Sequence, residues 1–201
     1  MSKIEREIRK APEQFKAEED SYIVEGYATT FEPYVLFTDE AGTNYSEQID
    51  QKAFDGADMS DVIFLYNHEG RVFARQKNNS LELNVDEHGL KVRADLGKTE
   101  GGRQLYEEIR AGLIDQMSFA FTVDADAYDK KTHTRTIQRI RKLYDVSAVS
   151  IPANPGTEIS ARSWFDGVIE QERAERLEAE KRAEQVRRIN LILGVKNDDN
   201  P

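Results

Sequence analysis

The sequence of 201 residues contains no cysteine. This absence excludes disulfide bonds, thiolate zinc sites and cysteine nucleophiles. Long apolar runs are missing as well, because no stretch approaches the ~20 residues that a membrane-spanning helix requires. No charged-then-apolar signal peptide opens the chain. We therefore expect a cytosolic protein that has no membrane partner.

Basic residues are in deficit. The chain carries 28 Lys and Arg against 38 Asp and Glu, which gives a formal net charge of -10. Phosphate contacts require clustered Lys and Arg, so this balance argues against non-specific nucleic-acid binding. Histidine is scarce too, with three residues and no helical His-x-x-x-His spacing for zinc. Asp124, Asp126 and Asp129 resemble part of a calcium loop but lack its glycine and terminal glutamate. We expect no metal and no cofactor.

Alternating apolar and polar residues dominate what is present, and they predict a mainly β domain. Residues 81–85 and 90–94 form the clearest predicted hairpin, with Gly89 in a turn where positive φ is expected. One helix is predicted inside the domain, over residues 100–111. The expected architecture is a mostly antiparallel domain of six or more strands with one or two packed helices. Further strands are expected at residues 22–31, 62–66, 117–123 and 135–151, loops at residues 32–50 and 124–134, and either a strand or a short helix near residue 4.

The C-terminal part has a different character. We place a domain boundary between residues 1–162 and 163–201, because the character of the sequence changes from Ser163 and residues 170–188 contain almost no apolar residues apart from Leu177, Val186 and alanines. Acid-before-base pairs at i,i+4 spacing predict a solvated helix, each pair contributing about 0.2–0.5 kcal/mol. Sustained heptads are missing, so a charged helical arm is favoured over a coiled coil. The three pairs are Glu172/Arg176, Glu178/Arg182 and Glu184/Arg188.

A candidate general base can be chosen by elimination. His88 lies in the predicted hairpin turn and His133 in a polar loop, and both positions are typical of exposed residues. His68 follows the apolar run of residues 62–66, where a buried strand emerges into a turn. A histidine satisfied by a backbone carbonyl at a strand end is the alternative interpretation.

Two further residues stand out in apolar strands. Ser118 shares its strand face with the small residues Ala120 and Thr122, which would leave room for a substrate backbone. Its alternative role is a small residue packed against the helix of residues 100–111. Asp145 sits in another apolar strand, where a carboxylate is costly unless it is paired. It could orient the His68 imidazole, or it could pair with a cation of its own segment. Those cations are Arg135, Arg139, Arg141 and Lys142.

His68, Ser118 and Asp145 together suggest a serine hydrolase with a base, a nucleophile and an acid. The Gly-x-Ser-x-Gly elbow of α/β-hydrolases is missing, but a triad is recognised by geometry rather than by motif order. The sequence does not identify the hydrogen-bond donors of an oxyanion hole. The candidates are backbone N–H groups, Arg135, Arg139 and Arg141.

Six segments between about residues 20 and 160 resemble, in order and spacing, the tailed-phage prohead proteases of the HK97 type. Two positions depart from the family's pattern, with Ala120 where glycine is usual and Asp145 where glutamate is usual. The segments are Gly26-Tyr-Ala-Thr-Thr-Phe31, Lys52-Ala-Phe54, Tyr66-Asn-His68, Glu87-His-Gly-Leu90, Ala111-Gly-Leu-Ile-Asp-Gln-Met-Ser-Phe-Ala-Phe121 and Tyr144-Asp-Val-Ser-Ala-Val-Ser-Ile-Pro-Ala-Asn154.

The resemblance implies a serine endopeptidase with a herpesvirus-protease-like antiparallel β-barrel plus a C-terminal charged helix. It assigns the base to His68 and the nucleophile to Ser118, and it leaves Asp145 as the third member of the triad. The implied partners are the major capsid protein with its scaffolding segment, and the protease itself through autocleavage or a dimer. The implied location is the procapsid in the bacterial host cytoplasm, where the charged arm would serve packaging or tethering.

Two other classes of function stay open on the sequence. The chain could be a non-catalytic assembly or scaffolding factor that keeps the same fold. It could also be a metal-dependent hydrolase, although its histidines and carboxylates lack the spacing of common metal sites.

Overall fold

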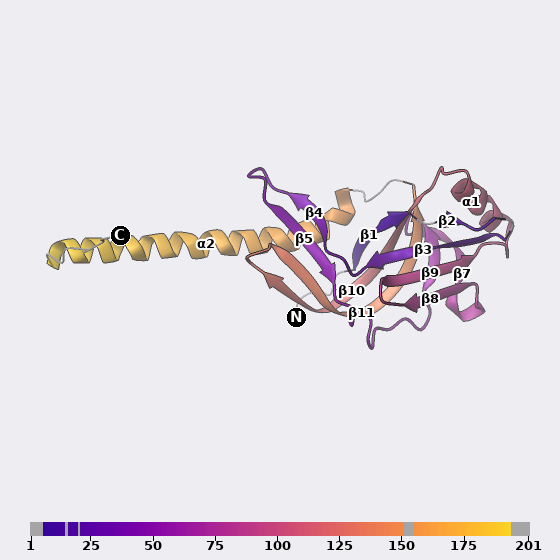
Figure 1. Cartoon of the computed structure of the whole chain (residues 1–201), viewed down its shortest axis with the longest axis horizontal. Coiled ribbons are helices and arrows are strands. Elements are labelled where there is room, and N and C mark those ends of the chain that lie inside the picture. Colours follow the sequence, from indigo (N-terminus) through magenta and orange to yellow (C-terminus); the bar gives the residue numbers. More distant parts are fainter. Residues whose placement is uncertain (1–5, 15, 20, 151–154, 194–201) are drawn as a thin grey trace. The chain divides into compact units, whose positions relative to one another are not determined.

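The computed structural model describes residues 6–14, 16–19, 21–150 and 155–193. The chain divides into two compact units, residues 1–161 and 162–201, and each unit is described by itself. The first unit contains two β-sheets and a short helix, and most of the second belongs to a single long helix (Figure 1).

The larger sheet has seven strands among the described residues. Its main path runs in the order β1-β10-β11-β5-β4, and β6 pairs with both β11 and β7. The strands are β1 (Glu7–Gln14), β4 (Tyr34–Thr38), β5 (Asn44–Ile49), β6 (Ile63–Tyr66), β7 (Glu69–Arg75), β10 (Gln116–Asp129) and β11 (Thr134–Val149).

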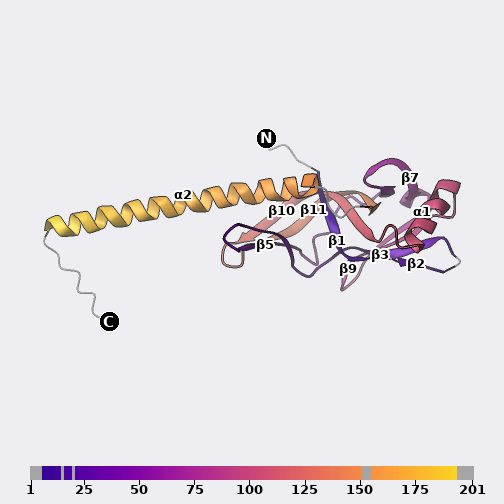
Figure 2. The same cartoon turned by 90° about the horizontal axis from the view of Figure 1, so that it is seen from above.

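The hairpin of β10 and β11 is the centre of this sheet, and its two long strands run side by side in Figure 2. Residues 117–122 of β10 and residues 145–149 of β11 are buried in the core of the first unit. Register shifts interrupt the pairing between Ala120 and Asp126, as expected for β-bulges that twist a long ribbon. The polar stretch of residues 124–129, which the sequence predicted as a loop, continues β10 instead.

Two pairings in the larger sheet are parallel. β11 pairs in parallel with β5 through residues 134–137 and with β6 through residues 145–148. The other strand pairings of the described residues are antiparallel, so the expected mostly antiparallel arrangement is confirmed. The described pairings also form two open sheets rather than a closed barrel, with β1, β4 and β7 as edges of the larger one.

The smaller sheet has the order β2-β3-β9-β8, with β2 (Lys16–Ala17), β3 (Ile23–Thr30), β8 (Leu81–Val85) and β9 (Gly89–Asp95). The predicted hairpin of β8 and β9 is confirmed. The reason given for Gly89 was wrong, because its φ is not positive. A Cβ at this position would lie 2.0 Å from the backbone oxygen of Thr29, so the close approach of β3 requires glycine.

Helix α1 (Glu100–Arg110) is confirmed at its predicted position. The Thr99 side chain caps it by accepting a hydrogen bond from the Gly102 backbone N–H at 3.0 Å. Leu105 and Ile109 are buried on one face, and Gly112 follows with a φ of +72° that suits a helix end. A short 3₁₀ helix, η1 (Gln76–Asn78), lies between β7 and β8.

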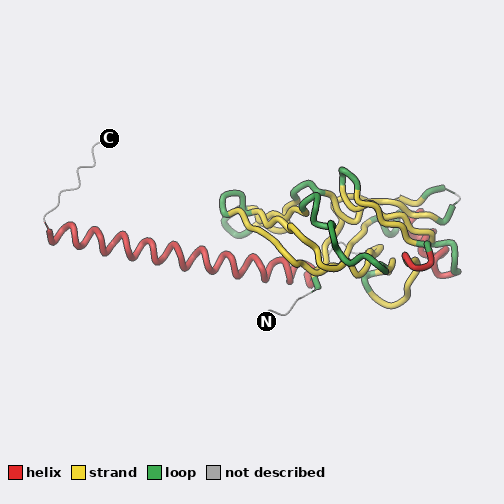
Figure 3. Tube along the Cα trace, turned by 90° about the horizontal axis from the view of Figure 1, so that it is seen from below, coloured by secondary structure: helices red, strands yellow, loops and turns green. Residues whose placement is uncertain are grey.

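Three other predictions are settled by the strands. Of the undecided segment of residues 4–8, Glu7 and Ile8 belong to strand β1, and residues 4 and 5 lie outside the described part of the chain. Residues 32–50, expected as a loop, contain β4 and β5, because Tyr45, Glu47 and Ile49 alternate toward the interior. Figure 3 shows the first unit as mostly strands, in yellow, joined by green loops and turns. Residues 135–151 were expected to hold one or two strands, and residues 134–149 form one.

Helix α2 (Pro155–Leu193) starts earlier than residue 163, where the sequence predicted the charged helix to begin. Its side chains between residues 173 and 189 are exposed. Of the three predicted pairs, Glu178 and Arg182 form an ion pair at 3.1 Å. No helix in the described part of the chain is both long and apolar enough to cross a membrane.

Candidate active site

His68 is presented by a tight turn between two strands. β6 ends at Tyr66 and β7 begins at Glu69, so Asn67 and His68 are the two central residues of the hairpin. Both have positive φ, 52° and 61°, which is the requirement of a type I′ turn. The Asn67 N–H donates to the Ala148 backbone oxygen at 2.9 Å, which fixes the turn against β11. The strained backbone thus aims the imidazole in a set direction.

The sheet register brings the nucleophile and acid candidates to the same place. β11 lies between β10 and β6, so its residues have neighbours on both sides. Ser118 pairs with Ser147 on β11, and Ala120 pairs with Asp145. On the other side, Ser147 pairs with Leu65, three residues before His68. β10, β11 and the turn that follows β6 therefore supply the three candidate residues.

The three side chains form one continuous hydrogen-bonded chain. The distance from Ser118 Oγ to His68 Nε2 is 2.7 Å, and the distance from His68 Nδ1 to Asp145 Oδ1 is 2.6 Å. Ser118 and Asp145 are buried, and the His68 side chain is 11% exposed. This is the order nucleophile, base and acid that acyl transfer requires.

The Ser118 hydroxyl has a second hydrogen-bond partner. Its oxygen lies 2.8 Å from the backbone oxygen of Arg9 on β1, the strand that pairs with β10. A hydroxyl has one hydrogen, so it donates either to His68 Nε2 or to this carbonyl. Transfer of the proton to His68 therefore requires the hydroxyl to turn away from Arg9.

Asp145 accepts hydrogen bonds on both carboxylate oxygens. Oδ1 accepts from the Ser147 hydroxyl at 2.8 Å in addition to His68. Oδ2 accepts from Nη2 of Arg6, which lies just before β1. A buried carboxylate is costly unless its oxygens are paired, so these partners explain how Asp145 is tolerated at 0% exposure.

The electrostatic surroundings keep His68 neutral. Burial lowers the pKa of His68 from 6.5 to about 4, and the positive charge of Arg6 adds to the lowering. A neutral imidazole with its hydrogen on Nδ1 donates to Asp145 and leaves Nε2 free to accept a proton from Ser118. The resting site is therefore in the protonation state that a general base needs at neutral pH.

The structure also bears on the alternative roles that the sequence left open for Asp145 and Ser118. Asp145 does pair with an arginine, but that arginine is Arg6, outside its own segment. Ser118 contacts His68 and Arg9, whereas α1 lies beside β2 and β7. Ala120 and Thr122, the small residues that share the Ser118 face, are buried, and space for a substrate backbone above the hydroxyl stays a prediction. His88 and His133 lie outside this cluster and contact Glu13 and Tyr128.

Sequence reasoning missed Arg6, Ser147 and the Arg9 carbonyl. Ser147 could have been found, because residues two apart on a strand share a face and Asp145 was already singled out. Arg6 lies in a charged segment with no pattern that points to the site. The Arg9 carbonyl is a backbone group that only the strand pairing places.

The basic residues of β11 form ion pairs with carboxylates of the first unit. Arg135 is buried and pairs with Glu7, Glu47 and Asp126. Arg139 and Arg141 each contact Asp124 at 2.7 Å. These engagements do not support the three arginines as oxyanion donors, so backbone N–H groups stay the candidates. Lys142 pairs with Asp58 at 2.8 Å.

These ion pairs also account for the acidic residues of β10. Asp124 and Asp126 are ion-paired with arginines across the hairpin, so their carboxylates do not converge as a calcium loop would. Within the described ranges, no three histidine, aspartate or glutamate side chains gather in a way that could hold a metal ion.

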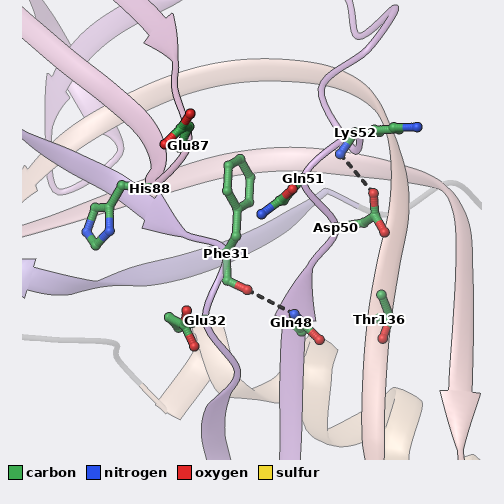
Figure 4. A pocket seen from close by; sticks show the side chains of 9 residues that line it. All are labelled: Phe31, Glu32, Gln48, Asp50, Gln51, Lys52, Glu87, His88 and Thr136. Atoms are coloured by element: carbon green, nitrogen blue, oxygen red, sulfur yellow. Dashed lines mark hydrogen bonds between the residues drawn. The ribbon is translucent and has the colours of Figure 1, made fainter.

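A cavity of about 480 Å³ lies elsewhere in the first unit (Figure 4). Phe31, Lys52, His88 and Thr136 are among its lining residues, and Gln48 donates to the Phe31 backbone oxygen at its edge. None of the three candidate residues lines it, so this cavity is not the substrate site of the cluster.

Comparison with known proteins gives one family match and two individual similarities. The family model described as "Caudovirus prohead serine protease" matches residues 8–168. The prohead protease of Enterobacteria phage HK97 is 31% identical over 150 residues, which cover 73% of this chain and 62% of that protein. The chain thus spans less than two thirds of this relative. The bacteriophage T4 capsid assembly protease, gp21, aligns with a TM-score of 0.44 and 14% identity, over 74% of this chain and 99% of that chain.

Proposed function

The chain belongs to the caudovirus prohead serine protease family, and from this premise we propose that it is a serine endopeptidase of procapsid maturation. The observation that carries the proposal is the hydrogen-bonded chain from Ser118 through His68 to Asp145, with distances of 2.7 Å and 2.6 Å. These are the contacts of a nucleophile with its base and of the base with its orienting acid.

In the proposed mechanism, His68 Nε2 takes the hydroxyl proton while Ser118 Oγ attacks the carbonyl carbon of the scissile peptide bond. The imidazolium then gives this proton to the leaving amine, and the acyl-enzyme forms. Water, deprotonated by His68, attacks the ester carbonyl and releases the acid product with Ser118 restored. Asp145 holds the hydrogen on Nδ1 and stabilises the imidazolium between these steps.

We propose the scaffolding segment of the major capsid protein and the protease itself as substrates. The setting is an assembling procapsid in the host cytoplasm. Support comes from the family description and from the similarity to the HK97 prohead protease. The unit of residues 1–162 would be the protease domain. The charged helix from residue 163 would be a packaging or tethering arm, cleaved in turn.

Co-expression with the cognate capsid protein tests this function. We expect the parent chain to shorten the capsid protein and Ser118→Ala to leave it at full length. Ser147→Ala is the matched control, because Ser147 is also buried and touches His68 Nδ1 and Asp145, but not Nε2. We expect it to retain cleavage at a reduced rate. Unchanged cleavage by Ser118→Ala would discard the nucleophile assignment.

A further inference from the structure

Oδ2 of Asp145 accepts a hydrogen bond from a residue that lies outside β10 and β11. Arg6 donates from Nη2 to Oδ2, while Oδ1 accepts from His68 and Ser147. The Arg6 side chain is 44% exposed and that of Asp145 is 1% exposed, so the guanidinium reaches a buried carboxylate from the surface. Arg6 also precedes residues 8–168, the range of the family match, so the match does not include this contact.

Two features keep Arg6 in this position. The guanidinium carbon lies 4.9 Å from the ring centre of Tyr144, the neighbour of Asp145, a distance at which a cation is attracted to the ring. Three residues later, Arg9 anchors β1 through Glu47, with Nε 2.5 Å from Oε1 and Nη2 2.8 Å from Oε2. The segment that carries Arg6 is therefore tied to the sheet close to the site.

We propose that Arg6 is a positioning residue of the triad: its guanidinium fixes the Asp145 carboxylate so that Oδ1 stays directed at His68 Nδ1. The inference rests on the proposed function for its catalytic meaning. Without a donor on Oδ2, one oxygen of a buried carboxylate would lose its partner, and the group would turn to share Oδ1 and Oδ2 among the remaining donors.

The guanidinium also sets the charge that His68 experiences. The groups that face the imidazole are Asp145 and Ser147 from β11, Ser118 from β10 and Arg6 from the segment before β1. Asp145 favours the imidazolium, whereas Arg6 neutralises this carboxylate and disfavours the imidazolium directly. Loss of the Arg6 charge therefore raises the pKa of His68, and the base becomes protonated at a higher pH.

A histidine titration followed by NMR in the full-length chain tests this role without any substrate. The three histidines are assigned with His88→Gln and His133→Gln. We expect Arg6→Gln to raise the His68 midpoint by on the order of one pH unit, and Arg6→Lys, which keeps the charge, to stay near the parent value. Lys142→Gln is the matched control, because Lys142 also lies over Tyr144, at 5.5 Å, but pairs with Asp58. We expect no shift for it.

The rate of Ser118 labelling by a fluorophosphonate, measured against pH, is the second readout. In Arg6→Gln, the acidic limb of this rate–pH profile should move to higher pH by the same amount as the NMR midpoint. A His68 midpoint in Arg6→Gln equal to that of the parent overturns the inference, as does an equal shift in Lys142→Gln. Failure of the parent to become labelled at any pH overturns the proposed function instead, and the NMR midpoints still decide the role of Arg6.

Discussion

A single buried carboxylate, Asp145, holds the imidazole of His68, the residue that we propose as the base. Asp145 accepts from His68, Ser147 and Arg6, and burial lowers the pKa of His68 to about 4. The imidazole is therefore neutral over most of the physiological range and ready to accept a proton.

The pH dependence follows from the lowered pKa of His68. A base with a pKa of about 4 is lost only below that pH, so the acidic limb of activity should have its midpoint near pH 4 rather than 6.5. The same shift makes the folded chain less stable as the pH falls from 6.5 toward 4, because the unfolded chain binds the proton more readily. Labelling of the parent by a fluorophosphonate between pH 3.5 and 8, with folding checked by circular dichroism, measures the limb, and a midpoint at 6.5 would contradict it.

Asp145→Asn tests the tautomer. The carboxamide can present its N–H₂ group to Nδ1, which would place the imidazole hydrogen on Nε2 and remove the acceptor for the Ser118 proton. We expect the turnover rate to fall by on the order of 10⁴-fold, the scale found when a triad aspartate is replaced by asparagine. The measurement is cleavage of the capsid protein over time. A loss below tenfold would show that Asp145 does not set the tautomer.

At the scale of elements, β1 is joined to the sheet by a buried ion-pair network next to the site. Glu47 of β5 is 0% exposed and accepts from Arg9 of β1, Arg135 of β11 and Tyr34 of β4. Four strands thus meet at one carboxylate. Removal of one member of a buried pair leaves the other charge without compensation.

Glu47→Gln should therefore lower the free energy of unfolding by about 3–5 kcal/mol. Denaturation in urea measures the loss. Asp124→Asn is the matched control, because Asp124 also contacts two arginines but lies at the surface, where ion pairs contribute little. An equally small effect of both variants would mean that the network does not hold the strands together.

Elements with strong local patterns could be predicted from the sequence, and those that depend on pairing could not. The β8–β9 hairpin and α1 follow from alternation, a 3.6-residue period and glycine stops. The strands β4 and β5 were missed because Pro33, Asp39, Gly42 and Asn44 indicate turns. Their strand character comes from burial of Tyr45 and Ile49 against the sheet.

The site shows the same division. Ser118 and Asp145 could be singled out as polar residues in apolar strands, and His68 as the histidine at the end of one, but their meeting depends on the register of three strands. Arg6 could not be found, because its role comes from a contact 139 residues apart in the chain. No local pattern encodes such a separation.

At the scale of the whole molecule, buried apolar residues and exposed charged residues are distributed unequally between the two units. The first unit buries an apolar core, and the described side chains of α2 between residues 173 and 189 are exposed. An exposed helix keeps its structure through weak i,i+4 pairs such as Glu178–Arg182, each contributing about 0.2–0.5 kcal/mol.

Amide hydrogen exchange should reflect this division. We expect amides of residues 173–189 to exchange much faster than those of β10 and β11, because local opening of an exposed helix costs little free energy. Mass spectrometry of the full-length chain resolves the two regions. Equal protection in both would mean that α2 is covered by another chain in solution.

The most direct test of the central claim is the chemical reactivity of the Ser118 hydroxyl. The full-length protein is treated with a fluorophosphonate at pH 7, digested and mapped by mass spectrometry. The account predicts one adduct, on Ser118, that is lost in Ser118→Ala and formed far more slowly in His68→Ala. An unmodified Ser118, or a labelling rate that does not depend on His68, would contradict the serine protease assignment and favour a non-catalytic role in assembly.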